Sequence, residues 1–180
     1  VNQNPIEFGI DIVIHSATKY LGGHSDISAG AIVSSEAMIK NIFASAKNFG
    51  GNLSDYTVWL LGRSIKTLYL RVKEQNKNAL KIANFLENEI WIDKVYYPGL
   101  ASHPNHELAK KQMKGFGGML SFDLSPKIDC KKFLLGLELI KPTMSLAGIE
   151  TTALSPKLTS HSLLTNKERF EQGINDQMVR

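Results

Sequence analysis

The chain has 180 residues, of which 43% are hydrophobic and 21% charged, and its formal net charge is +4. This composition is ordinary for a globular protein that buries a sizeable core. Lysines are scattered among acidic residues and no apolar run approaches the roughly 18 residues of a membrane span, so we expect neither a nucleic-acid nor a membrane partner.

The chain contains one cysteine, Cys130, so no internal disulfide is possible. The first residues have neither the basic start nor the apolar core of a signal peptide, and together these features favour a reducing, cytoplasmic location. Cys130 is expected to be a half-buried helix residue without a chemical role. The first residue is not methionine, which is consistent with a chain that begins inside a longer protein.

The first third of the chain predicts a loop, two strands and the stretch that joins them. Residues 1–9 are loop-like, residues 10–14 are expected to form a buried strand, and residues 29–33 a second strand. Two such apolar runs around a functional loop favour a mostly parallel or mixed sheet of the α/β class.

Helices are predicted after the second strand. Ser35 is placed to cap a helix over residues 36–48, and Ser54 or Asp55 a shorter one through Leu61. The longest helical pattern follows over residues 68–86, with apolar residues along one face. Cations are expected to decorate its other faces, namely Lys66, Arg71, Lys73, Lys77 and Lys81.

The remainder of the chain alternates between short elements. We expect strands at 91–97 and 119–123, helices at 107–113 and 130–137, irregular structure over 141–162, and a strand starting at 178. Thr165 and Glu168 have the spacing of a capping box that opens a helix ending near Gly173. The best domain boundary lies at residues 62–64, before the long helix.

The stretch Ser16 to Asp26, between the first two strands, carries the chemistry. It contains Lys19, flanked by small hydroxyl residues and followed by a glycine pair. Holding a phosphorylated aldehyde needs such a set, because an amine forms an imine with the aldehyde while hydroxyls and backbone N–H groups bind the phosphate. If extended geometry persists there, Ser16 and Thr18 lie on one side. From the spacing alone, a surface lysine in a loop is the alternative.

Histidines give weaker signals. His24 and Asp26 are interpreted as hydrogen-bonding residues that shape the loop, with an acid–base pair as the alternative. His103 and His106 have an H-x-x-H spacing, but no third ligand stands at a suitable distance in the sequence. We therefore expect no metal site.

Six segments resemble, in the same order, those of the Cys/Met-metabolism family of pyridoxal-phosphate enzymes. That family includes cystathionine γ-synthases and lyases, methionine γ-lyases and O-acylhomoserine sulfhydrylases. The segments are SATKYLGGHSD at 16–26, WLLGRSIKTL at 59–68, YPGLASHP at 97–104, QMKGFGGM at 112–119, SLAGIET at 145–151 and GINDQMVR at 173–180. The resemblance covers nearly the whole chain.

The resemblance implies an α/β fold of the fold-type-I class of pyridoxal-phosphate-dependent transferases, present as a carboxyl-terminal fragment. Residues 1–63 would form the end of the large cofactor domain. Residues 64–180 would form most of the small C-terminal α/β domain, truncated at its end. Members of the family are commonly homotetramers built as dimers of dimers, and they act on small amino-acid substrates.

The cofactor implied is pyridoxal 5'-phosphate. Lys19 resembles the family's imine lysine, which also moves protons at the substrate α and β carbons. Ser16 and Thr18 resemble the hydroxyls that bind the phosphate. The family's glycine-bearing phosphate loop, its ring-stacking tyrosine and its ring-pairing aspartate would lie upstream of residue 1, so the fragment by itself is expected to bind the cofactor poorly and to be inactive.

The substrate side follows from two later segments. Ser145 and Arg180 resemble the pair that grips the substrate α-carboxylate, a task suited to the planar fork of arginine. Ser160 stands beside that arginine, where the family usually has threonine. Ala147 replaces a usual glycine. Met144 stands where several cystathionine-handling members carry glutamate, which favours a shorter, uncharged thioether end.

The resemblance implies trans-sulfuration chemistry at Cγ of a sulfur or O-acyl amino acid. The main hypothesis is γ-elimination by a carbon–sulfur lyase that resembles methionine γ-lyase or cystathionine γ-lyase. One alternative is γ-replacement, which forms cystathionine or homocysteine from an O-acylhomoserine. A second alternative is a non-catalytic piece that serves only in folding or assembly.

Overall fold

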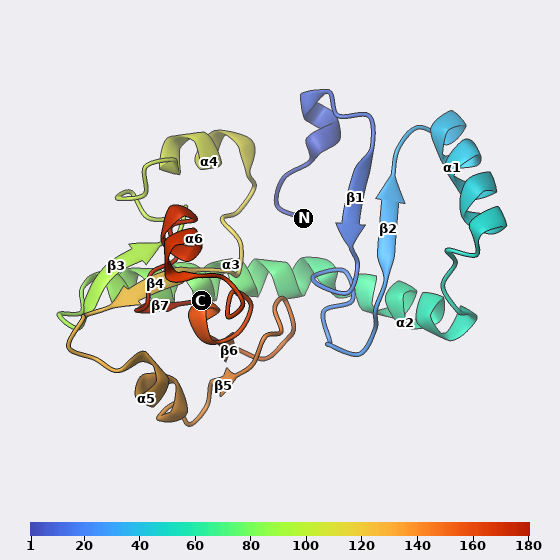
Figure 1. Ribbon diagram of the computed structural model, residues 1–180. Helices are drawn as coiled ribbons and strands as arrows, with labels where there is room; N and C mark the ends of the chain where they lie inside the picture. The colour runs from blue at the N-terminus through green and yellow to red at the C-terminus, as the bar shows by residue number, and fades with distance from the viewer. The chain divides into compact units, whose positions relative to one another are not determined.

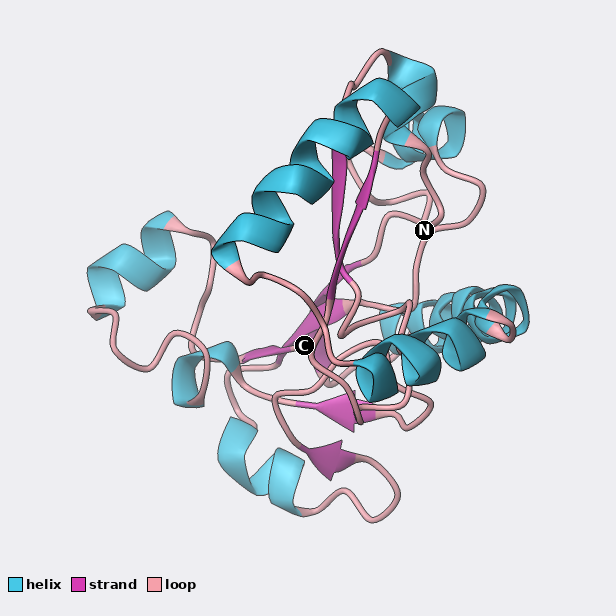
Figure 2. Ribbon diagram, turned by 90° about the vertical axis from the view of Figure 1, so that its right-hand side faces the viewer, coloured by secondary structure: helices cyan, strands magenta, loops and turns pink.

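A computed structural model describes residues 1–180 (Figure 1), and the chain divides into two compact units. The first unit comprises Val1–Lys73 together with Ala147–Ile149, and the second comprises Glu74–Leu146 together with Glu150–Arg180. Strands are short in both, and helices and loops make up the rest (Figure 2). None of the helices is both long enough and apolar enough to span a membrane.

The first unit opens with a short 3₁₀ helix, η1 (Pro5–Phe8), and an antiparallel pair of strands. These are β1 (Val13–Ser16) and β2 (Gly30–Val33). The prediction of a loop over residues 1–9 missed η1, which begins with a proline at a first-turn position that proline favours. The first strand starts later than the predicted 10–14, and the pairing is antiparallel.

The β1–β2 pair is more exposed than the sequence suggested. Ile14 is 74% exposed, although the apolar run at residues 10–14 had predicted a buried strand, and Val33 in β2 is also exposed. No other strand pairs with β1 or β2 in the structure. A two-stranded pair cannot cover its own faces, so these apolar side chains stay open within this chain.

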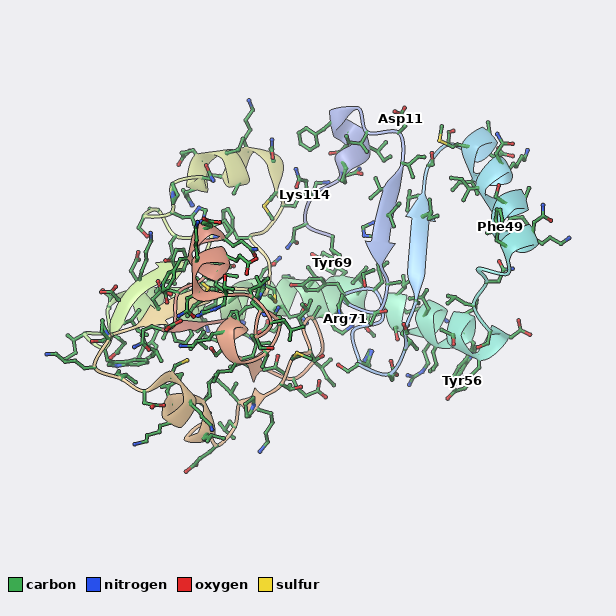
Figure 3. All side chains as sticks on the ribbon, in the orientation of Figure 1. Asp11, Phe49, Tyr56, Tyr69, Arg71 and Lys114 are labelled. Atoms are coloured by element: carbon green, nitrogen blue, oxygen red, sulfur yellow. The ribbon has the colours of Figure 1, made fainter.

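Two capped helices complete this part of the first unit. Ser35 accepts a hydrogen bond from the Met38 N–H at the start of α1 (Glu36–Phe49), and Ser54 does the same for Thr57 at the start of α2 (Asp55–Ile65). Both caps satisfy backbone donors that a helix leaves without partners, as predicted. Large apolar side chains on these helices are exposed, among them Phe49 and Tyr56 (Figure 3).

The core of the second unit surrounds an antiparallel sheet ordered β3–β4–β7. These strands are Ile92–Tyr96, Ser121–Leu124 and Met178–Val179. Helix α3 (Leu68–Glu87), which continues from the first unit, packs Ala79 and Ala83 against Tyr97 and Leu100. A second cluster joins α3, the sheet and α5 (Cys130–Leu135) through Leu86, Phe122, Leu124, Cys130, Leu134 and Val179.

Shorter elements carry the remaining chain of the second unit. They are α4 (His106–Gln112), the parallel pair β5 (Lys141–Pro142) and β6 (Thr152–Ala153), η2 (Pro156–Leu158) and α6 (Asn166–Glu171). The capping box at Thr165 is formed as predicted. The region 141–162 is not wholly irregular as predicted, because β5 and β6 pair with each other there.

Candidate active site

The segment 16–24, which we call the lysine turn, follows β1 and carries Lys19. Extended geometry ends at Ser16, whose carbonyl accepts a hydrogen bond from the Lys19 N–H at 3.1 Å. The Lys19 carbonyl in turn accepts from the Gly23 N–H at 2.7 Å. The condition for placing Ser16 and Thr18 on one side by alternation is therefore not met, because the chain turns between them.

The amine of Lys19 has no partner within the chain. The residue is half-buried, and its Nζ forms no hydrogen bond or ion pair with another group. A lysine can act as a nucleophile toward a carbonyl only when its amine is not tied up by a carboxylate. Lys19 meets this requirement.

The two neighbouring hydroxyls differ in their surroundings. The Ser16 hydroxyl is exposed and hydrogen-bonds to no group of the chain. Thr18 binds Ala29 through three contacts. The Thr18 N–H donates to the Ala29 carbonyl at 3.1 Å, the Ala29 N–H donates to Thr18 Oγ1 at 2.9 Å, and Oγ1 donates to the Ala29 carbonyl at 3.3 Å. Thr18 therefore fastens the lysine turn to the residue before β2.

The lysine turn leaves no room for a side chain at either residue of its glycine pair, Gly22 and Gly23. A Cβ at Gly22 would come within 2.9 Å of the Ala17 carbonyl and of the Ile27 side chain. Gly23 has a left-handed φ of +70°, and a Cβ there would overlap the guanidinium of Arg71. The turn thus depends on both glycines for different reasons.

His24 shapes the turn. Its Nδ1 donates to the Gly22 carbonyl at 2.8 Å, which supports the loop-shaping interpretation over the acid–base pair. Asp26 is exposed and forms no ion pair. The two side chains therefore do not form a coupled pair in this structure.

Arg71, predicted to lie outside the apolar face of the long helix, contacts the lysine turn. Its Nη1 donates to the Tyr20 carbonyl at 2.9 Å, and its Nη2 lies 3.4 Å from the Leu21 carbonyl and 3.0 Å from the Ser64 carbonyl (Figure 3). Burial lowers the pKa of the guanidinium below its ordinary value. The signal available in the sequence was a single arginine among the lysines of this helix, since only arginine offers a planar fork of donors.

In the second unit, Arg180 directly follows β7. Its backbone exchanges two hydrogen bonds with Leu154, and its Nη2 donates to the Met144 carbonyl at 3.4 Å. Burial lowers the pKa of this guanidinium below its ordinary value. No carboxylate lies within ion-pairing distance of Arg180, so its charge is available to an anionic ligand.

Ser145 and Ser160 also belong to the second unit. Ser145 is half-buried, and its carbonyl accepts from Thr152 Oγ1 at 3.0 Å. The Ser160 hydroxyl is exposed and bonds to His161 Nδ1 at 2.8 Å, with no hydrogen bond to Arg180. Lys19, Ser16 and Thr18 are thus gathered in one unit, and Ser145, Arg180 and Ser160 in the other.

The remaining side chains with chemical potential have structural partners. His106 Nδ1 donates to the Pro98 carbonyl at 2.8 Å and the ring stacks on Phe116, while His103 Nδ1 accepts from the Asn105 N–H. Cys130 is buried, which raises the pKa of its thiol. No group of three or more histidine, cysteine, aspartate or glutamate side chains is placed to hold a metal ion.

Comparison with known proteins gives a match along the whole chain. Residues 1–180 match the family described as Cys/Met metabolism PLP-dependent enzyme. A cystathionine beta-lyase of Lactococcus lactis subsp. cremoris is 45% identical over 179 residues, which are 99% of this chain and 47% of that protein. A cystathionine gamma-lyase of Bacillus subtilis is 44% identical with the same coverage of both chains.

A solved structure supports the same relationship. The cystathionine gamma synthase of Xanthomonas oryzae pv. oryzae, in complex with aminoacrylate and cysteine, superposes with a TM-score of 0.92 at 36% identity. The superposition covers 98% of this chain and 46% of that one. This chain therefore spans about half the length of the relatives it matches.

Proposed function

Because the chain belongs to the Cys/Met metabolism PLP-dependent enzyme family, we propose that it forms the carboxyl-terminal half of a carbon–sulfur lyase. The intact protein would remove a γ substituent from a sulfur-containing amino acid. The observation that carries this proposal is the lysine turn, where Lys19 presents an amine without internal partners beside two hydroxyls.

The donor set of the lysine turn suits pyridoxal phosphate. The cofactor supplies an aldehyde that a lysine amine can bind and a ring that accepts electrons from the substrate. We assign covalent attachment to Lys19 and phosphate binding to Ser16 and Thr18. The exposed Ser16 hydroxyl has its hydrogen available, and the hydroxyl hydrogen of Thr18 is held only in a long bond to a carbonyl.

Arg180 is assigned to the substrate α-carboxylate, with Ser145 and Ser160 in support. A guanidinium binds a carboxylate through two parallel hydrogen bonds, and Arg180 has no competing carboxylate in the chain. In the structure the Ser160 hydroxyl is hydrogen-bonded to His161.

In the reaction, Lys19 moves the protons. With the cofactor bound, its amine would be the base for the proton at Cα of the substrate and for the proton at Cβ, whose removal allows the γ substituent to leave. Water then completes the conversion to a keto acid, ammonia and a thiol. Met144, 61% exposed and beside the Arg180 contact, offers apolar surface that suits an uncharged thioether end.

The test of this assignment is Lys19→Ala in the full-length protein. We expect the visible absorption band of lysine-bound pyridoxal phosphate to disappear, together with turnover. Lys47→Ala is the matched control, because Lys47 is exposed on α1 and has no assigned role. If band and turnover both survive in Lys19→Ala, the assignment is wrong.

Gamma-replacement is the second candidate, favoured by the likeness to a cystathionine gamma synthase. Product analysis with and without an added thiol separates the two reactions. A lyase releases a keto acid and ammonia whether or not the thiol is present. A synthase forms a new thioether from an O-acylhomoserine only when the thiol is present.

For the intact protein we also propose a homotetramer, built as a dimer of dimers, in the cytoplasm. Its supporting observation is exposed apolar surface on the first unit, including Phe49 at 89%, Tyr56 at 68% and Trp59 at 60%. Surfaces of this kind are usually covered by another part of a protein or by another copy. Light scattering of the full-length protein measures the assembly, and a monomer at working concentration would exclude it.

A further inference from the structure

We propose that Arg71 is a positioning residue for Lys19, holding the lysine turn in the shape that presents the amine. This inference rests on the role proposed above for Lys19. Arg71 lies 52 positions further along the chain, on the first turn of α3, and belongs to the same compact unit as the lysine turn.

The backbone carbonyls of the lysine turn accept hydrogen bonds from donors inside the turn and from one side chain outside it. Backbone N–H groups inside the turn serve the carbonyls of Ser16, Ala17 and Lys19. The carbonyls of Tyr20 and Leu21, the two residues directly after Lys19, are served by Arg71 from outside. Since a half-buried carbonyl without a donor is costly, the conformation after Lys19 depends on this side chain.

The guanidinium is itself fixed on its other side. Nη2 donates to the Ser64 carbonyl at 3.0 Å, and Nε donates to Thr67 Oγ1 at 3.1 Å. Thr67 Oγ1 donates in turn to the Ser64 carbonyl, and Ser64 is buried. Arg71 therefore connects the lysine turn to the hydrogen-bonded junction between α2 and α3.

Two further observations support positioning over simple charge pairing. All the acceptors of Arg71 are neutral oxygens, so it contributes a fork of donors that lysine cannot reproduce. Gly23 packs against the guanidinium so closely that even a methyl group at this position would displace it. The absence of a side chain at Gly23 is thus part of the same arrangement.

The test compares Arg71→Lys and Arg71→Ala in the full-length protein with Lys77→Ala, an exposed α3 cation paired only with Glu74. Hydrogen exchange of peptides covering residues 19–24 is measured without added cofactor. We expect about tenfold faster exchange in both Arg71 variants, because the hydrogen bonds donated by the charged guanidinium are lost. The exchange rate of the control should not change. With cofactor, kcat should fall about tenfold while KM changes less than about twofold, and Arg71→Lys should not rescue it.

If residues 19–24 exchange hydrogen at the wild-type rate in both Arg71 variants, the inference is overturned. If neither variant folds, Gly23→Ala takes over the test, because it keeps Arg71 but displaces its guanidinium. A Gly23→Ala variant with the exchange rate and the kcat of the wild type would then reject the positioning role of Arg71. The outcomes are separable from the proposed function, which fails if Lys19→Ala keeps the visible band, whatever the exchange in the turn shows.

Discussion

Leu154 and Arg180 bind each other through both of their backbone groups. The Arg180 N–H donates to the Leu154 carbonyl at 2.9 Å, and the Leu154 N–H donates to the Arg180 carbonyl at 3.0 Å. Leu154 is buried, so this pair fixes the main chain of Arg180 without any help from the guanidinium. Substitutions at Arg180 therefore change the side chain while the backbone stays in place.

Replacing Arg180 by alanine is expected to weaken substrate binding specifically. Loss of a charged, two-bonded carboxylate contact corresponds to about 1.5–3 kcal/mol, or about a 10- to 100-fold rise in KM. Arg180→Lys should recover part of this, because the charge is kept without the fork. Steady-state kinetics of the full-length enzyme measure KM in both Arg180 variants. We expect both variants to retain the visible absorption band of the cofactor. An unchanged KM in Arg180→Ala would remove this residue from the substrate site.

Asp176, two residues before β7, pairs with Lys157 at 2.6 Å and with Arg169 at 2.8 Å. The guanidinium of Arg169 is 2% exposed, so Asp176→Asn leaves a buried charge without its counterion. We expect a loss of about 2 kcal/mol in the free energy of unfolding, less than for a fully buried pair because Asp176 is partly exposed. Glu36→Gln, which breaks an exposed pair on α1, should cost less than about 0.5 kcal/mol.

The Asp176 pair also predicts a pH dependence. Hydrogen bonds from Lys157 and Arg169 lower the pKa of Asp176 below its usual 3.8. A depressed pKa in the folded state contributes stability above the unfolded value, and this contribution is lost as pH falls through the folded value. In urea unfolding, the difference between wild type and Asp176→Asn should be constant near neutrality and shrink below about pH 4. A difference that persists in acid would contradict this account.

Tyr96 donates its hydroxyl hydrogen to Asp123 Oδ2 at 2.7 Å, and the other oxygen of this buried carboxylate has no partner. Burial, aided by the bond to Asp123, raises the pKa of Tyr96 to about 12. Because the folded pKa is the higher one, this stabilisation is complete below about pH 10 and is lost as the pH rises toward 12. Tyr96→Phe should lower the free energy of unfolding by about 1–3 kcal/mol.

Two measurements check the Tyr96 prediction. Tyrosinate absorbance measured against pH should show one tyrosine that ionises only toward pH 12, and this ionisation should be missing in Tyr96→Phe. Tyr69→Phe serves as the control for stability, because Tyr69 is exposed (Figure 3) and should change it little. If the two substitutions change the free energy of unfolding equally, the hydrogen bond from Tyr96 to Asp123 does not contribute to stability.

Ala147 has a φ of +63°, at the position where the sequence departs from a usual glycine. A side chain in the left-handed region is strained, whereas glycine adopts it freely. We therefore expect Ala147→Gly to raise the free energy of unfolding by about 0.5–1 kcal/mol, after allowing for the greater freedom of glycine in the unfolded chain. Ala44→Gly, within α1, should act in the opposite direction. Thermal unfolding of the two variants decides the sign.

Helix starts were predictable from sequence, because their determinants are local. Ser35, Ser54 and Thr165 each cap a helix at the predicted place, through bonds to a residue three positions along. Such bonds depend only on a side chain and its immediate neighbours. The position of the lysine after the first strand was predictable for the same reason.

Contacts between distant segments were not predictable in this way. The pairing of β5 with β6 joins residues eleven positions apart, and the bonds from Arg71 to the lysine turn span about fifty positions. Periodicity placed Arg71 among the cations outside the apolar face of the long helix, because it describes a helix face but not what contacts that face. The left-handed conformations of Gly23 and Ala147 likewise depend on neighbours that the local sequence does not specify.

The contacts between Thr18 and Ala29 have a thermodynamic consequence for any anion that binds beside Lys19. A threonine hydroxyl carries a single hydrogen, which here points to the Ala29 carbonyl, while its oxygen accepts from the Ala29 N–H. Donation to an anion must therefore replace an internal bond, so the affinity gained at Thr18 is a difference between two bonds. Ser16 has no such competing bond, and its hydroxyl should contribute the larger share of the binding.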